Sequence, residues 1–239
     1  MHRSILAGTG LALFCPCAAI AQDEPLVAWP RPLITEILYA VPMGPEGDAS
    51  GDGSRHANGD EFVELINPHD RPIQLKGFTL TDRNSPKRGQ FKFTFPEFEL
   101  APSQVVVVFN GNGQAFRGPV GDSNRAPDGP NGYLHDAWIF SAGVTSRQVA
   151  FSNGGDWVLL ADPRNRPVQL IHWGTFQEQM PPGRYLIEEA PRTTTGSVQR
   201  RDASSALVKH DSIDGLQLSP GRFEPPEQDQ QEPAASPSG

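Results

Sequence analysis

The sequence GDASGDGSRHANGDE, residues 47–61, carries the clearest chemical pattern in the chain. Oxygen-bearing side chains alternate in its first half and a glycine follows them, as at the start of an EF-hand calcium loop. The second half departs from that pattern, because Gly59 stands where a bidentate glutamate closes such a loop. Two acidic residues directly after Gly59 can take over this role if the loop bulges. The predicted calcium ligands are Asp48, Ser50, Asp52, Ser54, Asp60 and Glu61.

Two other interpretations of this stretch stay open. Its residue types are also the usual turn formers, so residues 47–61 can form a solvated acidic turn without an ion. Asp60 and Glu61 also suggest paired carboxylates for acid–base catalysis. Adjacent strand residues face opposite sides of a sheet, however, and this alternation would hold the two carboxylates apart.

Other patterns of catalytic or binding residues are weak. The histidines are scattered without zinc-protease spacing, and the G-x-S-x-G elbow of serine hydrolases does not occur. Among the four tryptophans, which together could offer a platform for a sugar or a peptide, Trp157 and Trp173 lie in predicted strands and are expected in the core. Trp138 is the one expected at the surface.

Short strands are expected to position these residues, since the chain contains 24 glycines and 24 prolines, which favour turns. Alternating or continuous apolar residues predict the strands, as in Gln90–Phe95, where the phenylalanines share one face. The predicted strands are 33–39, 61–67, 78–82, 90–95, 104–110, 157–161 and 168–173, the last two as a hairpin. Residues 111–132 read as an inserted loop, and 134–149 as a short helix or an edge cover. Buried positions should include Phe91, Phe93, Val106 and Trp157.

The order of several segments resembles the lamin tail domain family in its secreted bacterial form. The segments are LITEILY, GDEFVELINP, IQLKGFTLTD, FELAPSQVVVVFN, FSNGGDWVLLAD and VQLIHWG, with SPGRF as a closing segment. The resemblance extends over about residues 32–223. It implies an all-β fold, an immunoglobulin-like antiparallel β-sandwich with long inserted loops, and no catalytic residues.

Both ends of the chain differ in composition from this domain. Residues 1–21 combine a basic start, a short apolar run and small residues before Gln22, which predicts a cleaved secretory signal. Cleavage removes Cys15 and Cys17, and the bulky Phe14 and rigid Pro16 argue against a lipoprotein signal. Residues 22–31 form a lead-in, and the acidic, proline-rich residues 224–239 are expected to be disordered.

Charge and motifs together predict a non-catalytic exported module for binding or adhesion, secreted or periplasmic. The formal net charge of −8 is unsuited to nucleic acid. After signal cleavage no further apolar stretch predicts a membrane span. The expected partner is an unknown protein or an envelope or extracellular polymer. Two alternatives are a hydrolase, or accessory domain of one, acting on extracellular polymers, and a calcium-stiffened structural spacer.

Overall fold

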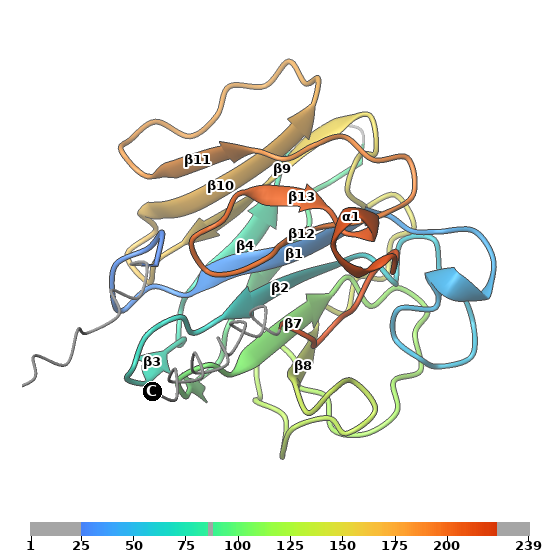
Figure 1. Cartoon of the computed structure of the whole chain (residues 1–239), viewed down its shortest axis with the longest axis horizontal. Helices are drawn as coiled ribbons and strands as arrows, with labels where there is room; N and C mark the ends of the chain where they lie inside the picture. Colours follow the sequence, from blue (N-terminus) through green and yellow to red (C-terminus); the bar gives the residue numbers. More distant parts are fainter. Residues whose placement is uncertain (1–24, 86–87, 224–239) are drawn as a thin grey trace, which may run out of the picture.

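A computed structural model describes residues 25–85 and 88–223, which form two packed β-sheets with long connecting loops (Figure 1). The predicted signal segment 1–21 and the predicted tail 224–239 lie outside the described residues. The strands are β1 (Leu33–Ala40), β2 (Phe62–Ile66), β3 (Ile73–Gln74), β4 (Thr79–Asp82), β5 (Lys92–Thr94), β6 (Glu99–Leu100), β7 (Val105–Phe109), β8 (Trp138–Ser141), β9 (Gly155–Ala161), β10 (Pro167–Gly174), β11 (Leu186–Glu189), β12 (Gly196–Arg200) and β13 (Leu207–Lys209). The two short helical elements are η1 (Pro45–Gly47) and α1 (Asp211–Asp214).

The larger sheet has six strands in the order β13-β12-β1-β2-β7-β8, and the second has five in the order β11-β10-β9-β4-β5. Strands β3 and β6 form a separate two-stranded sheet. Most neighbouring pairs are antiparallel, while the edge pairs β7–β8 and β10–β11 are parallel. The fold is therefore the predicted immunoglobulin-like β-sandwich, with a parallel strand added at one edge of each main sheet.

All seven predicted strands are present, with ends shifted by one or two residues, and β9 and β10 form the predicted hairpin. The region 134–149 contains a strand rather than a helix, because β8 pairs in parallel with the four-valine strand β7. Sequence periodicity also missed the short strands β3 and β6 and the three C-terminal strands β11, β12 and β13.

The main core lies between the two sheets and contains Phe91, Phe93 and Val106, whereas Trp157 is buried outside this core, with its ring edge to face against Phe176. Phe91, Phe93 and Val106 have no exposed surface, and Trp157 is 6% exposed. Phe93 and Phe95 each pack edge to face on Phe140 at a ring-centroid distance of 5.5 Å, and Phe91 packs in the same way on Phe151. Edge-to-face contacts add specific geometry to the burial of apolar area.

The outer face of the six-stranded sheet is also buried. A second apolar cluster there includes Leu38, Phe62, Val107 and Ile139, with the inserted loop and the C-terminal segment packed against it. Strand β2 is therefore buried on both faces: Val63 and Leu65 face the main core, and Phe62 faces the second cluster. The sheet thus has no solvent face along β1 and β2, and any polar residue there must find a buried partner.

Within the part of the chain that the structure describes, neither helical element is long or apolar enough to cross a membrane.

Candidate functional site

The predicted calcium loop is folded around its own acidic side chains. Asp48 accepts hydrogen bonds from the backbone amides of Asp52 and Gly53, at 3.1 and 2.8 Å. The carboxylate of Asp52 accepts the amide of Ser54 at 2.8 Å and the amide of Ala115 at 2.9 Å. These bonds close the turns of the loop and fasten it to the inserted segment.

Asp60 ties the end of this loop to its beginning. Its carboxylate accepts the amides of Ser50 and His56, at 3.0 and 2.6 Å, and the side-chain amide of Gln114 at 2.9 Å. Burial raises the pKa of Asp60, and Asp48 adds to the rise, while these hydrogen bonds work against it. Three predicted ligands, Asp48, Asp52 and Asp60, therefore belong to one hydrogen-bonded loop.

Glu61 points away from that loop, as strand alternation predicts. Its carboxylate accepts the amide of Phe151 at 3.0 Å and lies in a separate buried acidic group with Asp82 and Asp156. Burial raises the pKa of Glu61 well above its ordinary value, and raises the pKa of Asp82 to about 8. Asp156 also has a raised pKa, because burial outweighs its amide bonds and its proximity to Arg83 and Arg88.

The six predicted ligands are thus divided between two places. Among residues 25–85 and 88–223, no three or more His, Cys, Asp or Glu side chains are arranged to hold a metal ion. Ser54 contributes its amide to Asp52, and Ser50 contributes its amide to Asp60. The calcium assignment remains a prediction.

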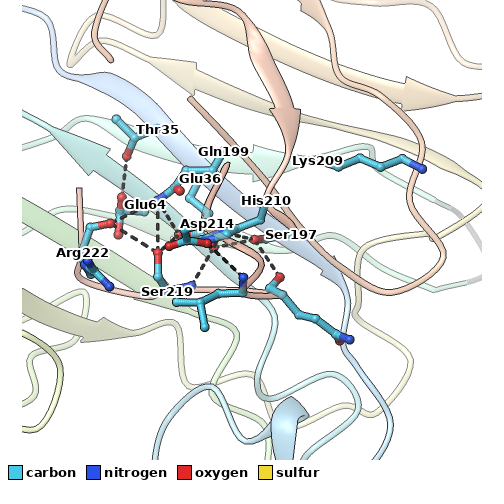
Figure 2. A network of polar contacts seen from close by, with 12 residues as sticks. Thr35, Glu36, Glu64, Ser197, Gln199, Lys209, His210, Asp214, Ser219 and Arg222 are labelled. Atoms are coloured by element: carbon cyan, nitrogen blue, oxygen red, sulfur yellow. Dashed lines mark hydrogen bonds and ion pairs between the residues drawn. The ribbon is translucent and has the colours of Figure 1, made fainter. Parts of the chain in front are cut away.

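A buried network of hydrogen-bonded side chains, among them acids, a serine and a histidine, lies on the outer face of the six-stranded sheet (Figure 2). Glu36 of β1 accepts hydrogen bonds from the Ser197 hydroxyl, from the Ser219 amide at 3.1 Å and from the Gln199 side chain at 3.2 Å. His210 Nδ1 lies 3.0 Å from the same carboxylate. Each of these side chains is at most 6% exposed.

A serine, a histidine and a carboxylate in contact invite comparison with a hydrolytic triad, but their geometry differs. In a triad the serine and the acid contact opposite nitrogens of the imidazole ring. Here the Ser197 hydroxyl and the Glu36 carboxylate both lie 3.0 Å from Nδ1 of His210, and Nε2 lies 3.5 Å from Asp214. The three side chains therefore converge on one ring nitrogen inside the protein.

The closing segment SPGRF completes this network. Gly221 donates its amide to Glu64 of β2 at 2.8 Å, and Thr35 donates its hydroxyl to the same carboxylate at 2.7 Å. Gly221 has φ +91°, and a side chain there would lie 2.3 Å from the Leu134 carbonyl oxygen, so only glycine fits. The network fastens the C-terminal segment across β1 and β2.

An open pocket at one end of the sandwich has a different character. It has a volume of about 380 Å³ and lies between the lead-in to β1 and the β9–β10 hairpin loop. The lining includes Trp29, Arg31, Arg164 and Arg166 with a single acidic residue, Asp162. Trp29 is 44% exposed, whereas Trp138, the expected surface tryptophan, is half-buried and packs edge to face on Phe98.

Sequence reasoning missed both the network and the pocket. Glutamates inside the otherwise apolar strands LITEILYA and FVELI signal that Glu36 and Glu64 need buried partners. Nothing local identifies those partners, which lie up to 183 residues away in Ser219. The pocket arginines come from two segments more than 130 positions apart, and the sequence gives no sign that they meet.

Comparison with known proteins agrees with the fold. The family model for the lamin tail domain matches residues 33–175, from the first residue of β1 to the end of the β9–β10 hairpin. Strands β11 to β13 and the closing segment lie beyond the matched residues. A comparison with curated proteins gave no match. The match covers more than half of the sequence, has the expected sandwich architecture, and shows that the chain belongs to the lamin tail domain family.

Proposed function

We propose that the protein is a non-catalytic binding or adhesion module that is exported and works in the periplasm or outside the cell. The observation that supports this function most directly is the burial of the Ser197–His210–Glu36 group. A hydrolytic nucleophile must reach its substrate, yet Ser197 is only 1% exposed and its hydroxyl is engaged by Glu36. The family match adds support, because the lamin tail domain is an immunoglobulin-like module.

Exposed aromatic surface favours a binding module over a calcium-stiffened spacer. A spacer needs no accessible aromatic patch, whereas Trp29 is exposed beside an open pocket. An unknown protein or an envelope or extracellular polymer is the partner that fits an exported module. The net charge of −8 argues against nucleic acid as a general partner.

A pull-down assay with simultaneous product analysis separates the candidate functions. The exported, processed chain is incubated with the cell-envelope fraction of the organism that encodes it. Saturable cosedimentation without release of soluble fragments is the expected result. Fragment release that disappears in Ser197→Ala would instead establish the hydrolase alternative, and absence of cosedimentation would contradict a binding role.

A further inference from the structure

We infer that the pocket between Trp29 and the β9–β10 hairpin loop binds acidic sugar units, in which a carboxylate is carried on a pyranose ring. The inference deepens the proposed function and rests on it, since it names the ligand class of a binding module. The volume of about 380 Å³ falls within the range of about 300–1,000 Å³ that is usual for small-ligand pockets.

Hydrogen bonds hold both walls of the pocket in place. In the first wall, the Arg31 amide donates to the Ala28 carbonyl at 3.1 Å, and the Arg31 carbonyl contacts Nε2 of His69 at 3.0 Å. In the second wall, the Asp162 carboxylate accepts the amides of Arg164 and Arg166, at 2.9 and 3.0 Å. These bonds fix the backbone of both walls, so the conformational freedom lost on binding is mainly that of the exposed side chains of Arg31 and Arg164.

The charge of the lining is opposite to that of the whole chain. Arg31, Arg164 and Arg166 face one carboxylate, Asp162, which is already paired with Arg166 at 2.6 Å. Among the described residues, the guanidinium groups of Arg31 and Arg164 make no ion pair. In a chain with a net charge of −8, two such groups at one pocket select for an anion.

Trp29 supplies a fixed aromatic surface beside these charges. Its indole N–H donates to the Pro72 carbonyl at 3.3 Å, and the Arg71 guanidinium lies 4.2 Å from the ring centroid. Both contacts orient the ring while leaving 44% of the residue exposed. An indole ring can pack against the C–H face of a pyranose, and guanidinium groups bind carboxylates in a bidentate manner.

This combination favours an acidic sugar over an acidic peptide. Extended peptides are commonly captured by hydrogen bonding along a free strand edge. The pocket is lined mainly by the turn at residues 28–31 and by the hairpin loop 162–166, and Gln74 of β3 and Phe78 complete the lining. A flat ring with an anionic substituent matches an aromatic surface with adjacent arginines better than a main-chain strand does.

Titration calorimetry with defined oligomers tests the assignment. The exported, processed chain is titrated with trigalacturonate as the uronate probe, maltotriose as the neutral sugar and oligoglutamate as the acidic peptide. Only trigalacturonate should bind. The double variant Arg31→Met/Arg164→Met should weaken this binding by about tenfold or more, the scale of at least one lost charged hydrogen bond. Trp29→Ala should weaken it by about tenfold through the loss of the aromatic contact area.

The matched control is Arg147→Met/Arg192→Met, which removes the same charge from exposed positions outside this pocket and should leave the affinity unchanged. Unfolding curves confirm that every variant is folded. Equal affinity in wild type and both pocket variants, equal binding of maltotriose, or tighter binding of oligoglutamate would overturn the assignment. If Trp29→Ala still cosediments fully with the envelope fraction, the binding function stands and the pocket assignment fails. If the wild type does not cosediment, the proposed function itself fails.

Discussion

Glu36 on β1 and Glu64 on β2 occupy directly paired positions on neighbouring antiparallel strands, and neither has any exposed surface. Two carboxylates so placed disfavour each other's ionisation. Burial, and then the proximity of Glu36, raise the pKa of Glu64 well above its ordinary value. The closing segment supplies amide donors to both, from Ser219 and Gly221. Ser219 and Gly221, which lie outside the residues that match the family model, therefore donate hydrogen bonds to two buried glutamates that lie within them.

The raised pKa of Glu64 makes stability depend on pH. The folded state holds this proton more tightly than the unfolded chain, so the stabilisation is complete below the ordinary pKa of 4.5 and declines as pH rises. Glu64→Gln keeps an uncharged side chain at every pH and should make that decline shallower. Urea unfolding at pH 5, 7 and 9 measures the effect, with the exposed Glu99→Gln as control. If the free energy of unfolding falls with pH as steeply in Glu64→Gln as in wild type, Glu64 is not the source of the decline.

Asp82 gives a second pH effect with a defined range. Burial raises its pKa to about 8, and the nearby Asp156 adds to the rise, while the Phe91 amide and Arg88 oppose it. Because the folded state binds this proton more tightly than the unfolded chain, protonated Asp82 adds to the free energy of unfolding. This contribution is complete below the ordinary pKa of 3.8 and is lost as pH rises through about 8. Asp82→Asn should remove this pH-dependent loss of stability, so that the free energy of unfolding of the variant rises relative to that of wild type between pH 5 and 9. Asp70→Asn, at an exposed position, should leave the pH profile unchanged.

Truncation of Phe93 tests the packing between the sheets. Its ring is fully buried and makes edge-to-face contacts with Phe95 and Phe140. Phe93→Ala should therefore lower the free energy of unfolding by about 3–5 kcal/mol through lost burial and the remaining cavity. Denaturant titration measures the loss, and the exposed neighbour Lys92→Ala should change stability by less than about 0.5 kcal/mol. A similarly small loss for Phe93→Ala would show that this face is not packed as described.

Strands with one apolar face were predictable, and strands with buried polar faces were not. Phe91, Phe93 and Phe95 alternate with polar residues and so mark β5 by themselves. In β12 the sequence GSVQR is largely polar, yet every residue is buried. Its polar side chains have buried partners, since the Ser197 hydroxyl and the Gln199 side-chain amide donate hydrogen bonds to Glu36. Hydropathy cannot distinguish such a strand from a loop, since its polar groups are satisfied by distant partners.

The candidate site shows the same division between local and long-range information. The loop at 47–61 was recognisable from spacing, and its turns do form around Asp48 and Asp52. That Asp60 stays with this loop while Glu61 leaves it also follows from strand alternation. The arrangement of Trp29 with Arg164 depends on which loops meet at one end of the sandwich, and only the assembled fold supplies this.

Export is tested at the new N-terminus. Residues 1–21 carry the order of a secretory signal, so the processed chain should begin at Gln22 and contain no cysteine. Intact-mass spectrometry of the protein recovered from the periplasm or the medium measures the start. A chain that retains Met1, or that carries lipid on Cys15 or Cys17, would contradict the prediction.

Calcium binding by the loop at 47–61 is the remaining prediction. Each carboxylate of Asp48, Asp52 and Asp60 already accepts hydrogen bonds from donors in or beside the loop, which holds the oxygens in fixed positions. An ionised carboxylate has about four acceptor sites, so these oxygens retain capacity for a hard cation such as calcium.

If calcium binds only to the folded state, it raises stability by mass action, by about 2.7 kcal/mol at a hundredfold excess over the dissociation constant. Melting temperatures are therefore measured for the processed chain with calcium, with magnesium and with a chelator. Calcium should raise the melting temperature more than magnesium does, because the smaller ion requires strict octahedral geometry. Asp52→Ala should abolish the difference, while Asp70→Ala, outside the loop, should preserve it. Equal melting temperatures in all three conditions would assign the acidic side chains of the loop to turn closure alone.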